Sequence, residues 1–249
     1  MIKKVVVMAA GKGTRMLELS ADKPKHLIDV KDRPFLYYSL NNIKAAGFAE
    51  IILVVGHKKE KMAEFAQKYA GEFSLKLVDQ FEKMGAEKYG TAMPIAAVEE
   101  SIDGENFVVI NGDDLYAVED LTRMKELDDE FCYAGGMTTD DPSPYGLFKT
   151  DGNSFLERIV EKPKPDIDFD ASRPRDYTVN IGMYKFTPEI FAAIKNIGLS
   201  PRGEYELTDA VSTLAKEKKV KTVPVTGKWK SFTNPDDVKR MEDFLQIMN

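Results

Sequence analysis

Cysteine, histidine and long apolar runs are scarce in this sequence, and each scarcity excludes a class of protein. The single cysteine, Cys132, cannot form an internal disulfide, and with two histidines the chain has no Cys/His cluster for zinc. No apolar run approaches the ~18 residues of a membrane-spanning helix. The apolar N-terminal stretch continues into Gly-Lys-Gly rather than a cleavage site, which argues against a signal peptide. We therefore expect a soluble, cytoplasmic protein with no membrane partner.

An excess of positive charge is also missing. With 35 Lys and Arg against 41 Asp and Glu, the formal net charge is −6, which argues against a nucleic acid as partner. The composition is otherwise globular, with 43% hydrophobic and 31% charged residues among 249. Such a chain buries roughly 70–75% of its unfolded surface, enough for one large core. A site for phosphate groups must therefore rely on a few local basic residues.

Apolar runs alternate with amphipathic stretches over the first 115 residues. The runs predict buried strands over 4–10, 51–55, 75–78 and 107–110, and helices are predicted after Pro34 and over 57–70 and 91–101. This alternation predicts a parallel sheet that is covered by helices on both faces. Sheets of this kind bind ligands at the carboxyl ends of their strands.

The second half of the sequence has a less regular pattern. Strands are predicted over 131–138, 147–149, 157–160, 178–186 and 221–225. Thr187 and Asn234 each precede a proline and an acidic residue, a pattern typical of a helix start with the first residue as N-cap. Cys132 lies in an apolar run, where it is expected to be packed and inert. No internal repeat is visible, so we expect one domain whose second half supplies a lid-like subregion.

A glycine-rich turn over residues 11–15, with the sequence GKGTR, follows the first predicted strand. Glycines let backbone N–H groups approach an anion, and Lys12 and Arg15 add positive charge. The P-loop pattern is absent, and the dinucleotide-binding pattern Gly-x-Gly-x-x-Gly fails at Met16, with no helix expected over 17–24. The turn is therefore interpreted as a phosphate site or as a simple tight turn, and a dinucleotide-dependent oxidoreductase is disfavoured.

Asp113 follows the strand predicted over 107–110 and therefore lies at the same sheet edge as the glycine-rich turn, about 100 residues away in sequence. A carboxylate beside a phosphate site suits Mg²⁺, and the alternative is an Asx-type turn. Lys25 follows Pro24, which restricts the backbone and presents the lysine from a defined segment. The alternative for Lys25 is a solvated basic loop.

These motifs together resemble the signature of the sugar-1-phosphate nucleotidylyltransferases. That family includes glucose-1-phosphate thymidylyl- and uridylyltransferases and N-acetylglucosamine-1-phosphate uridylyltransferase. The resemblance covers nearly the whole chain, and the order and spacing of its segments make it specific. The matching segments are AAGKGTRM (9–16), PK (24–25), GTA (90–92), GD (112–113), YG (145–146), VEKP (160–163), NIGMY (180–184) and RGEYELTD (202–209).

The resemblance implies a Rossmann-like, GT-A-like α/β fold in which helices flank a mixed central sheet. It implies a single domain over 1–249, with a nucleotide-binding half (1–115) and a small sugar-phosphate-binding half (116–249). The implied reaction uses Mg²⁺ and transfers a nucleotidyl group from a nucleoside triphosphate, with UTP or dTTP favoured, to glucose 1-phosphate or N-acetylglucosamine 1-phosphate. Because the attacking phosphate oxygen is already anionic, positioning and charge neutralisation suffice for catalysis.

The resemblance also assigns roles by position. It implies catalytic roles for Arg15, Lys25 and Asp113, with Asp113 as metal ligand. The expected nucleotide-binding residues are Ala9, Ala10, Gly11, Gly13, Thr14, Arg15, Gln80, Gly90 and Thr91. The expected sugar-phosphate-binding residues are Gly146, Glu161, Lys162 and Asn180.

Two positions depart from the family pattern. Gln80 lies ten residues before Gly90, a longer interval than is usual in the family. Ser231 stands two residues after Trp229, where the family often has an acidic metal ligand. Two alternatives stay open: a CTP-dependent cytidylyltransferase acting on phosphocholine or a polyol phosphate, and a catalytically silent subunit of the same fold. The sequence predicts no particular oligomeric state.

Overall fold

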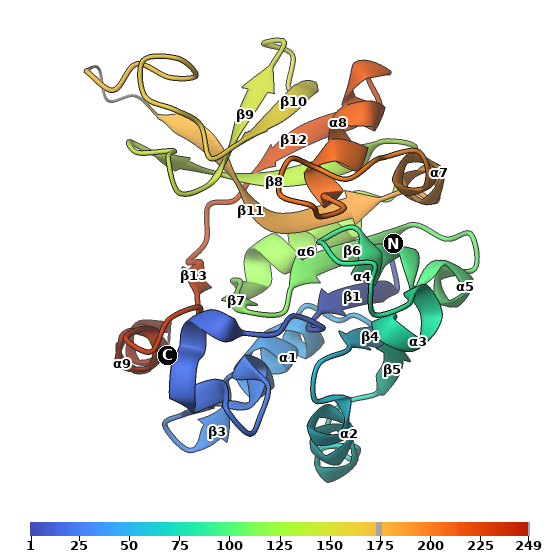
Figure 1. Ribbon diagram of the computed structural model, residues 1–249, viewed down its shortest axis with the longest axis vertical. Helices are drawn as coiled ribbons and strands as arrows, with labels where there is room; N and C mark the ends of the chain where they lie inside the picture. Colours follow the sequence, from blue (N-terminus) through green and yellow to red (C-terminus); the bar gives the residue numbers. More distant parts are fainter. Residues whose placement is uncertain (173–175, 249) are drawn as a thin grey trace.

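The computed structural model describes residues 1–172 and 176–248, and one nine-stranded sheet runs through the molecule (Figure 1). The sheet path is β10-β9-β11-β6-β1-β4-β5, and β8 joins β11 to β12 beside it. Each strand lies within two residues of its predicted position. The strands are β1 Lys4–Met8, β4 Glu50–Val55, β5 Leu75–Asp79, β6 Phe107–Asn111, β8 Cys132–Thr139, β9 Gly146–Thr150, β10 Leu156–Glu161, β11 Tyr177–Phe186 and β12 Val220–Pro224.

The strands of the first half, β5, β4, β1 and β6, are all parallel. Side chains of β1 alternate between two core clusters, with Val6 on one face of the sheet and Val5 and Val7 on the other. All three valines are fully buried. The apolar run at the start of the sequence therefore forms, as predicted, a central strand that is covered on both faces.

The long strand β11 makes the sheet mixed, because it runs antiparallel to β6, β8 and β9. Its register shifts between Asn180 and Tyr184, and Gly182 lies in this irregular stretch with φ +71°. A Cβ atom at position 182 would lie 2.0 Å from Nδ2 of Asn111, so the site requires glycine. The pairing of β11 with β6 joins the two halves in one sheet, and the predicted mixed sheet is confirmed.

Helices and short strands complete the fold. The α-helices are α1 Phe35–Ala45, α2 Lys59–Lys68, α3 Gln80–Met84, α4 Met93–Ala96, α5 Glu99–Ile102, α6 Val118–Glu126, α7 Glu189–Lys195, α8 Leu207–Lys216 and α9 Asp237–Met248. The 3-10 helices are η1 Thr14–Ser20 and η2 Lys25–Leu27, and two-residue strands pair β2 Asp29–Val30 with β3 Arg33–Pro34 and β7 Asp114–Leu115 with β13 Lys230–Ser231.

A third core cluster, separate from the two that flank the sheet, ties the C-terminal helix to the N-terminal half. Met241 and Leu245 of α9 pack with Met16 of η1 in this cluster. The ring of Phe232 stacks on Phe35 with centroids 4.6 Å apart. Figure 1 accordingly shows α9 near the dark-blue segment that follows β1, and β13 near β7. This packing brings residues after Trp229 next to those that follow β6.

Several expectations about helices are wrong. Residues 91–101 form α4 and α5 rather than one helix, because Val98 donates to the carbonyl three residues back and has φ −100°, ψ 2°. No α-helix forms over 17–24, but a 3-10 helix, η1, begins at Thr14 within the glycine-rich turn and extends to Ser20, with non-helical angles at Leu17 (φ 50°, ψ −129°). The Ser20 hydroxyl donates to Gly13 O at 3.0 Å. Helices α3, α6 and α8 were not predicted.

Both predicted N-caps are also wrong. The Thr187 hydroxyl lies 3.5 Å from the Cys132 sulfur instead of capping α7. Helix α9 begins at Asp237, whose carboxylate accepts the backbone N–H groups of Thr233 and Asn234, so Asn234 is not the cap. The expected burial of Cys132 is confirmed, since it is 1% exposed.

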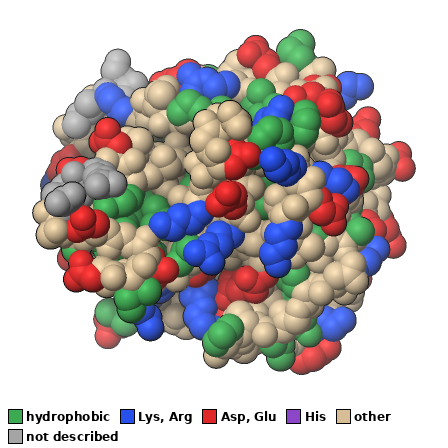
Figure 2. Space-filling view, turned by 90° about the horizontal axis from the view of Figure 1, so that it is seen from above, with side chains coloured by type: hydrophobic (Ala, Val, Ile, Leu, Met, Phe, Trp, Pro, Cys, Tyr) green, Lys and Arg blue, Asp and Glu red, His purple; other side chains and the backbone are tan. Residues whose placement is uncertain are grey.

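Charged side chains of both signs are spread over the face of the molecule that Figure 2 shows. Figure 2 shows Lys and Arg interspersed with Asp and Glu over the face seen from above, with apolar side chains only in small groups. Among the helices of residues 1–172 and 176–248, none combines the length and apolar character that crossing a bilayer requires.

Candidate active site

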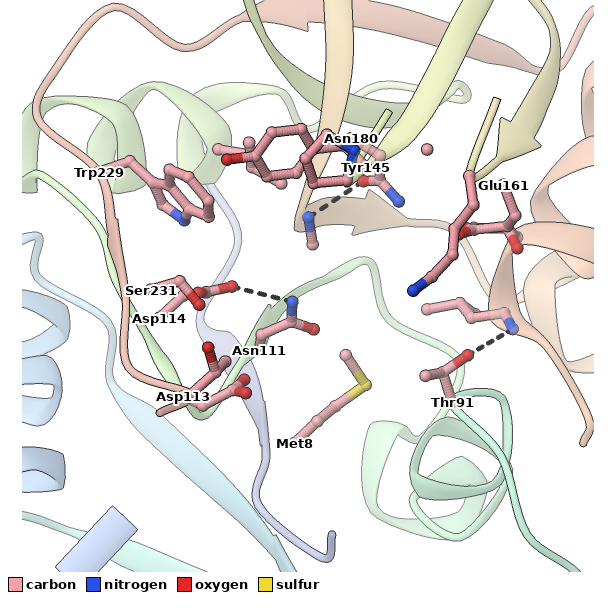
Figure 3. A pocket seen from close by; sticks show the side chains of 18 of the residues that line it. Met8, Thr91, Asn111, Asp113, Asp114, Tyr145, Glu161, Asn180, Trp229 and Ser231 are labelled. Carbon is pink, nitrogen blue, oxygen red and sulfur yellow. Dashed lines mark hydrogen bonds between the residues drawn. The ribbon is translucent and has the colours of Figure 1, made fainter. Parts of the chain in front are cut away.

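A pocket of about 970 Å³ lies between the two halves of the sheet, where β1 and β6 end (Figure 3). The predicted convergence of the glycine-rich turn with Asp113 is confirmed, because Arg15 and Asp113 both line this pocket. Seven of the residues implied by the family resemblance contribute to its wall: Arg15, Thr91, Asp113, Gly146, Glu161, Lys162 and Asn180. Their functional roles stay predictions, but the fold brings them together.

Lys25 and Asp113 form an ion pair at this edge of the sheet, although 88 positions separate them. Burial alone would raise the pKa of Asp113, but the charge and hydrogen bond of Lys25 outweigh it and hold that pKa below its usual value. The backbone around the pair is fixed, since Phe232 N donates to Asp113 O at 2.8 Å. The site therefore holds a preformed cation and carboxylate side by side.

The glycine-rich turn and the 3-10 helix η1 that contains its last residues are held in place by contacts with neighbouring residues. Ala9 and Ala10 are buried beneath it, and the Nζ of Lys58 donates to the carbonyls of Ser20 and Ala21 at the end of η1. Gly11, Thr14 and Arg15 are exposed, and Gly13 is half-buried. Exposed backbone in a fixed turn is the arrangement that an incoming triphosphate requires.

Gln80 is buried directly after β5 and is not among the residues that line the pocket. Its neighbour Asp79 caps α3 by accepting the backbone N–H groups of Phe81 and Glu82. The structure therefore places Gln80 at the correct sheet edge but not in the pocket wall. Its role in reading the base stays a prediction.

The segments 90–92 and 202–209 form one wall of the pocket. Gly90 has φ +130°, and a Cβ there would lie 2.3 Å from the carbonyl oxygen of Tyr205. Ala92 N donates to that same oxygen at 3.0 Å. The Thr91 hydroxyl accepts from Leu207 N at 2.9 Å and lines the pocket. Gly90 thus permits the close contact, and Thr91 faces the ligand space.

Arg202 and Glu206 belong to the same wall, and sequence reasoning gave neither a role. Two guanidinium nitrogens of Arg202 donate to one Glu206 oxygen at 3.1 and 2.6 Å. The Glu206 side chain is 6% exposed, whereas that of Arg202 is 50% exposed and lines the pocket. The signal that could have found them was the RGEYELTD segment itself, which carries both.

Gly146, Glu161 and Asn180 occupy one row across three adjacent strands. Gly146 of β9 is paired with Asn180 of β11 on one side and with Glu161 of β10 on the other. The Asn180 amide is held in one orientation, since its oxygen accepts from Gly182 N and its nitrogen donates to the Tyr184 hydroxyl at 2.6 Å. A carboxylate and a fixed amide in a row can bind successive hydroxyls of a ring.

Aromatic residues that the sequence did not single out as ligands close the pocket. The rings of Tyr145 and Trp229 meet edge to face with centroids 6.1 Å apart. The Trp229 indole nitrogen and the Thr208 hydroxyl are buried in the pocket wall without a hydrogen-bond partner among the described residues. Buried polar atoms without partners are uncommon, and the Thr208 hydroxyl lies close enough to Glu161 to stabilise its charged carboxylate.

Asp114 adds a second carboxylate next to Asp113. Burial, and then the neighbouring charge of Asp113, raise the pKa of Asp114 to about 7. Its Oδ2 atom accepts from Nδ2 of Asn111 at 2.9 Å and from the hydroxyl of Tyr116 at 3.2 Å. The nearby Ser231 hydroxyl stabilises the charged carboxylate of Asp114 and so partly lowers its pKa. The Oδ1 atom of Asp114 has no hydrogen bond of normal geometry within the described residues.

The carboxylates of Asp113 and Asp114 at this edge are hard oxygen donors that could hold a metal ion. No group of three His, Cys, Asp or Glu side chains suited to a metal occurs in the part of the chain that the structure describes. Asp113 and Asp114 line the pocket from neighbouring positions, and Oδ1 of Asp114 is buried without a hydrogen-bond partner among the described residues. Such a sparse oxygen set fits Mg²⁺, which keeps several waters and shares phosphate oxygens.

Comparison with known proteins agrees with this geometry. The family model described as nucleotidyl transferase matches residues 4–247. The chain is 29% identical over 241 residues to the bifunctional protein GlmU of Methanocaldococcus jannaschii, covering 96% of this chain and 53% of that protein, so it spans about half of that relative. It is 29% identical over 248 residues to the UTP–glucose-1-phosphate uridylyltransferase AglF of Haloferax volcanii, covering 98% and 96% of the two chains.

A solved structure extends the likeness to the fold. A UDP-glucose pyrophosphorylase complexed with UDP-glucose superposes with a TM-score of 0.81 at 24% identity, covering 100% of both chains. This likeness supports the Rossmann-like architecture, and the family match covers the segments that carry the resemblance in sequence. The chain therefore belongs to the nucleotidyl transferase family.

Proposed function

We propose that this protein transfers a nucleotidyl group from a nucleoside triphosphate, UTP or dTTP, to a hexose 1-phosphate, either glucose 1-phosphate or N-acetylglucosamine 1-phosphate. A phosphate oxygen of the sugar 1-phosphate attacks the α-phosphorus, the bond to the bridging oxygen breaks, and pyrophosphate leaves. The observation that carries the proposal is the row of Asn180, Gly146 and Glu161, which shares one pocket with Asp113, the ion-pair partner of Lys25. The cytoplasm, where nucleoside triphosphates are available, is the compartment that this reaction requires.

The two sides of the pocket suit the two substrates. On the first-half side, the exposed turn with Thr14 and Arg15 provides backbone N–H groups and a guanidinium for a triphosphate. On the other side, Glu161 accepts from sugar hydroxyls and the adjacent Lys162 offers an ammonium to the sugar phosphate. Both anions are thereby held close together, which is the main requirement of this chemistry.

Lys25 is the group that we assign to the charge developing at the α-phosphorus. It is already held at the sheet edge by Asp113, with 13% of its side chain exposed, so little reorganisation is needed when charge builds up. Asp113 would hold Mg²⁺ together with water and triphosphate oxygens, and the bound ion supplies further charge neutralisation. We assign no general base, because the attacking oxygen carries its own negative charge.

The phosphocholine alternative is favoured by one observation, the Tyr145–Trp229 pair in the pocket wall, because aromatic faces attract quaternary ammonium groups. The row containing Asn180 and Glu161 favours a ring with several hydroxyls instead. The two alternatives predict different acceptors and can be separated directly.

A pyrophosphate-release screen tests the proposal. Four nucleoside triphosphates are combined with glucose 1-phosphate, N-acetylglucosamine 1-phosphate, phosphocholine and ribitol 5-phosphate in the presence of Mg²⁺. We expect release with UTP or dTTP and a hexose 1-phosphate, and a near-total loss in Asp113→Asn. Asp151→Asn is the matched control, because Asp151 pairs with Lys218 outside the pocket. Turnover only with CTP and phosphocholine or ribitol 5-phosphate would favour the cytidylyltransferase, and no turnover with any pair would favour the silent subunit.

A further inference from the structure

The carboxylate of Asp114 has no assignment in the proposed reaction, although it is built into the pocket. The residue is 3% exposed and lines the pocket beside Asp113. Its Oδ2 atom has two partners, but Oδ1 has none among the described residues. Figure 3 places this carboxylate beside Ser231 and Asn111, on the wall that also carries Asp113. A buried carboxylate oxygen without a partner is costly, so a ligand that satisfies it is the natural explanation.

The strand pair β7–β13 determines what lies opposite Asp114. In this antiparallel pair, Asp114 faces Ser231 directly. Directly opposed residues on neighbouring strands have Cβ atoms about 4.5–5.5 Å apart, so their side chains reach the same space. The pair is held firmly, because Phe232 N donates to Asp113 O and the Phe232 ring stacks on Phe35. Side chains at positions 114 and 231 therefore reach the same part of the pocket.

The chemistry around that point selects a cation. The nearby acceptors are the Asp113 carboxylate, the Asp114 carboxylate and the Ser231 hydroxyl, all hard oxygen donors. Lys25 neutralises only Asp113. The hydrogen-bond donors Asn111 and Tyr116 are already used on Oδ2. A divalent cation that arrives with the triphosphate would satisfy Oδ1 and reduce the repulsion between the two carboxylates.

We propose that Asp114 is a direct ligand of the divalent cation, supplying from β7 the second carboxylate that β13 lacks at Ser231. This assignment rests on the proposed function, because the nucleotide substrate brings the cation to the pocket. It makes Asp114 a residue of the site rather than a buried structural acid. It also predicts that the carboxylate can be moved across the strand pair.

Mn²⁺ binding to the full chain tests this proposal without relying on turnover. Free Mn²⁺ is counted by electron paramagnetic resonance during titration, with and without a nucleoside triphosphate analogue carrying a methylene bridge between the α- and β-phosphates. We expect Asp114→Asn, which preserves shape and an acceptor for Asn111, to weaken Mn²⁺ binding in the ternary mixture by about 10–100-fold. The exchange variant Asp114→Ser/Ser231→Asp should restore binding to within about threefold of the wild type, the scatter allowed for a relocated ligand.

Two controls separate a ligand from a structural acid. Asp151→Asn removes a carboxylate with 18% side-chain exposure outside the pocket and should bind Mn²⁺ as the wild type does. Thermal unfolding shows whether each variant is folded, and if Asp114→Asn is not, the exchange variant decides alone. A structural role for Asp114 would give no reason for an aspartate at 231 to restore cation affinity.

Three results would overturn the proposal: unchanged Mn²⁺ affinity in Asp114→Asn, failure of the folded exchange variant to restore it, or no Mn²⁺ binding by the wild type. The pyrophosphate-release screen keeps this question apart from the proposed function. If the wild type turns over a hexose 1-phosphate while Asp114→Asn binds Mn²⁺ normally, only the role of Asp114 is wrong. If Mn²⁺ binds through Asp114 and no substrate pair reacts, the cation site stands and the proposed reaction fails.

Discussion

His26 makes the stability of this protein depend on pH in a way that can be worked out from the structure. It lies in η2 next to Lys25, is 1% exposed, and its Nδ1 atom has no hydrogen-bond partner within the described residues. Burial and, after it, the positive charge of Lys25 lower the pKa of His26 to about 3, although the negative charge of Asp113 partly offsets them. The folded protein therefore keeps this imidazole neutral at pH values where an exposed histidine is protonated.

The direction and the size of this pH dependence follow from the difference in proton binding between the folded and the unfolded chain. Below pH 6.5 the unfolded chain binds a proton at His26 that the folded chain refuses until about pH 3, so acid favours unfolding over that window. Between pH 7 and pH 5 this difference costs about 2 kcal/mol of unfolding free energy. For a chain of this length the same cost lowers the unfolding temperature by about 4–8 °C.

Calorimetry of the wild type, His26→Gln and His57→Gln at pH 7 and pH 5 measures this contribution. His26→Gln should lose about 2 kcal/mol less than the wild type between the two pH values, because glutamine takes up no proton in either state. His57→Gln is the matched control, since it removes the other histidine, which is half-buried shortly after β4. Equal acid losses in the wild type and His26→Gln would show that the buried imidazole is protonated in the folded state, and the reasoning would be refuted.

Three further variants test the site and the sheet. Lys25→Ala should lower kcat by about 10²–10³, the effect of losing one transition-state donor, and a change confined to KM for the nucleotide in steady-state kinetics would contradict that role. Lys162→Ala should raise KM for the sugar 1-phosphate by about 10–150-fold, as the loss of a charge-assisted contact does. An equal rise in KM for both substrates would show that Lys162 does not bind the sugar phosphate specifically. Gly182→Ala should cost about 1–3 kcal/mol in urea unfolding because its Cβ would overlap Asn111, and Gly198→Ala, which has open space, should not.

The strands were predictable because they carry their own signal. A strand that is buried on both faces must be apolar at every position, as β1 and β4 are, so its run of valines and isoleucines marks it without knowledge of its neighbours. Helix α8 also carries its own signal, because Leu207, Val211 and Leu214 recur at helical spacing on its buried face, so its omission was a misreading of the sequence. The break at Val98 is different, because it follows from a local turn that periodicity does not encode.

The site divides in the same way. The row of Gly146, Glu161 and Asn180 was predictable in membership, since each residue sits in a recognisable motif, but not in geometry, which comes from strand register. The family resemblance placed Ser231 near the expected metal ligand Asp113, but no local pattern predicted that Asp114 pairs with Ser231. Both strands, β7 and β13, are two residues long, so neither shows a period, and their contact joins segments that only the third core cluster brings together.

The charges of the pocket also explain why a cation should accompany the nucleotide. Lys25 and Arg202, two cations of the site, are each bound to a carboxylate, Asp113 and Glu206 respectively. A phosphate group that binds either cation shares its positive charge with that carboxylate, so the pair as a whole gains negative charge. At Arg202 the cost is limited, because Glu206 keeps contacts with Ser200 and Thr91. At Lys25 the Asp113 carboxylate lies next to Asp114, so the arriving polyanion must bring positive charge with it to that point of the pocket.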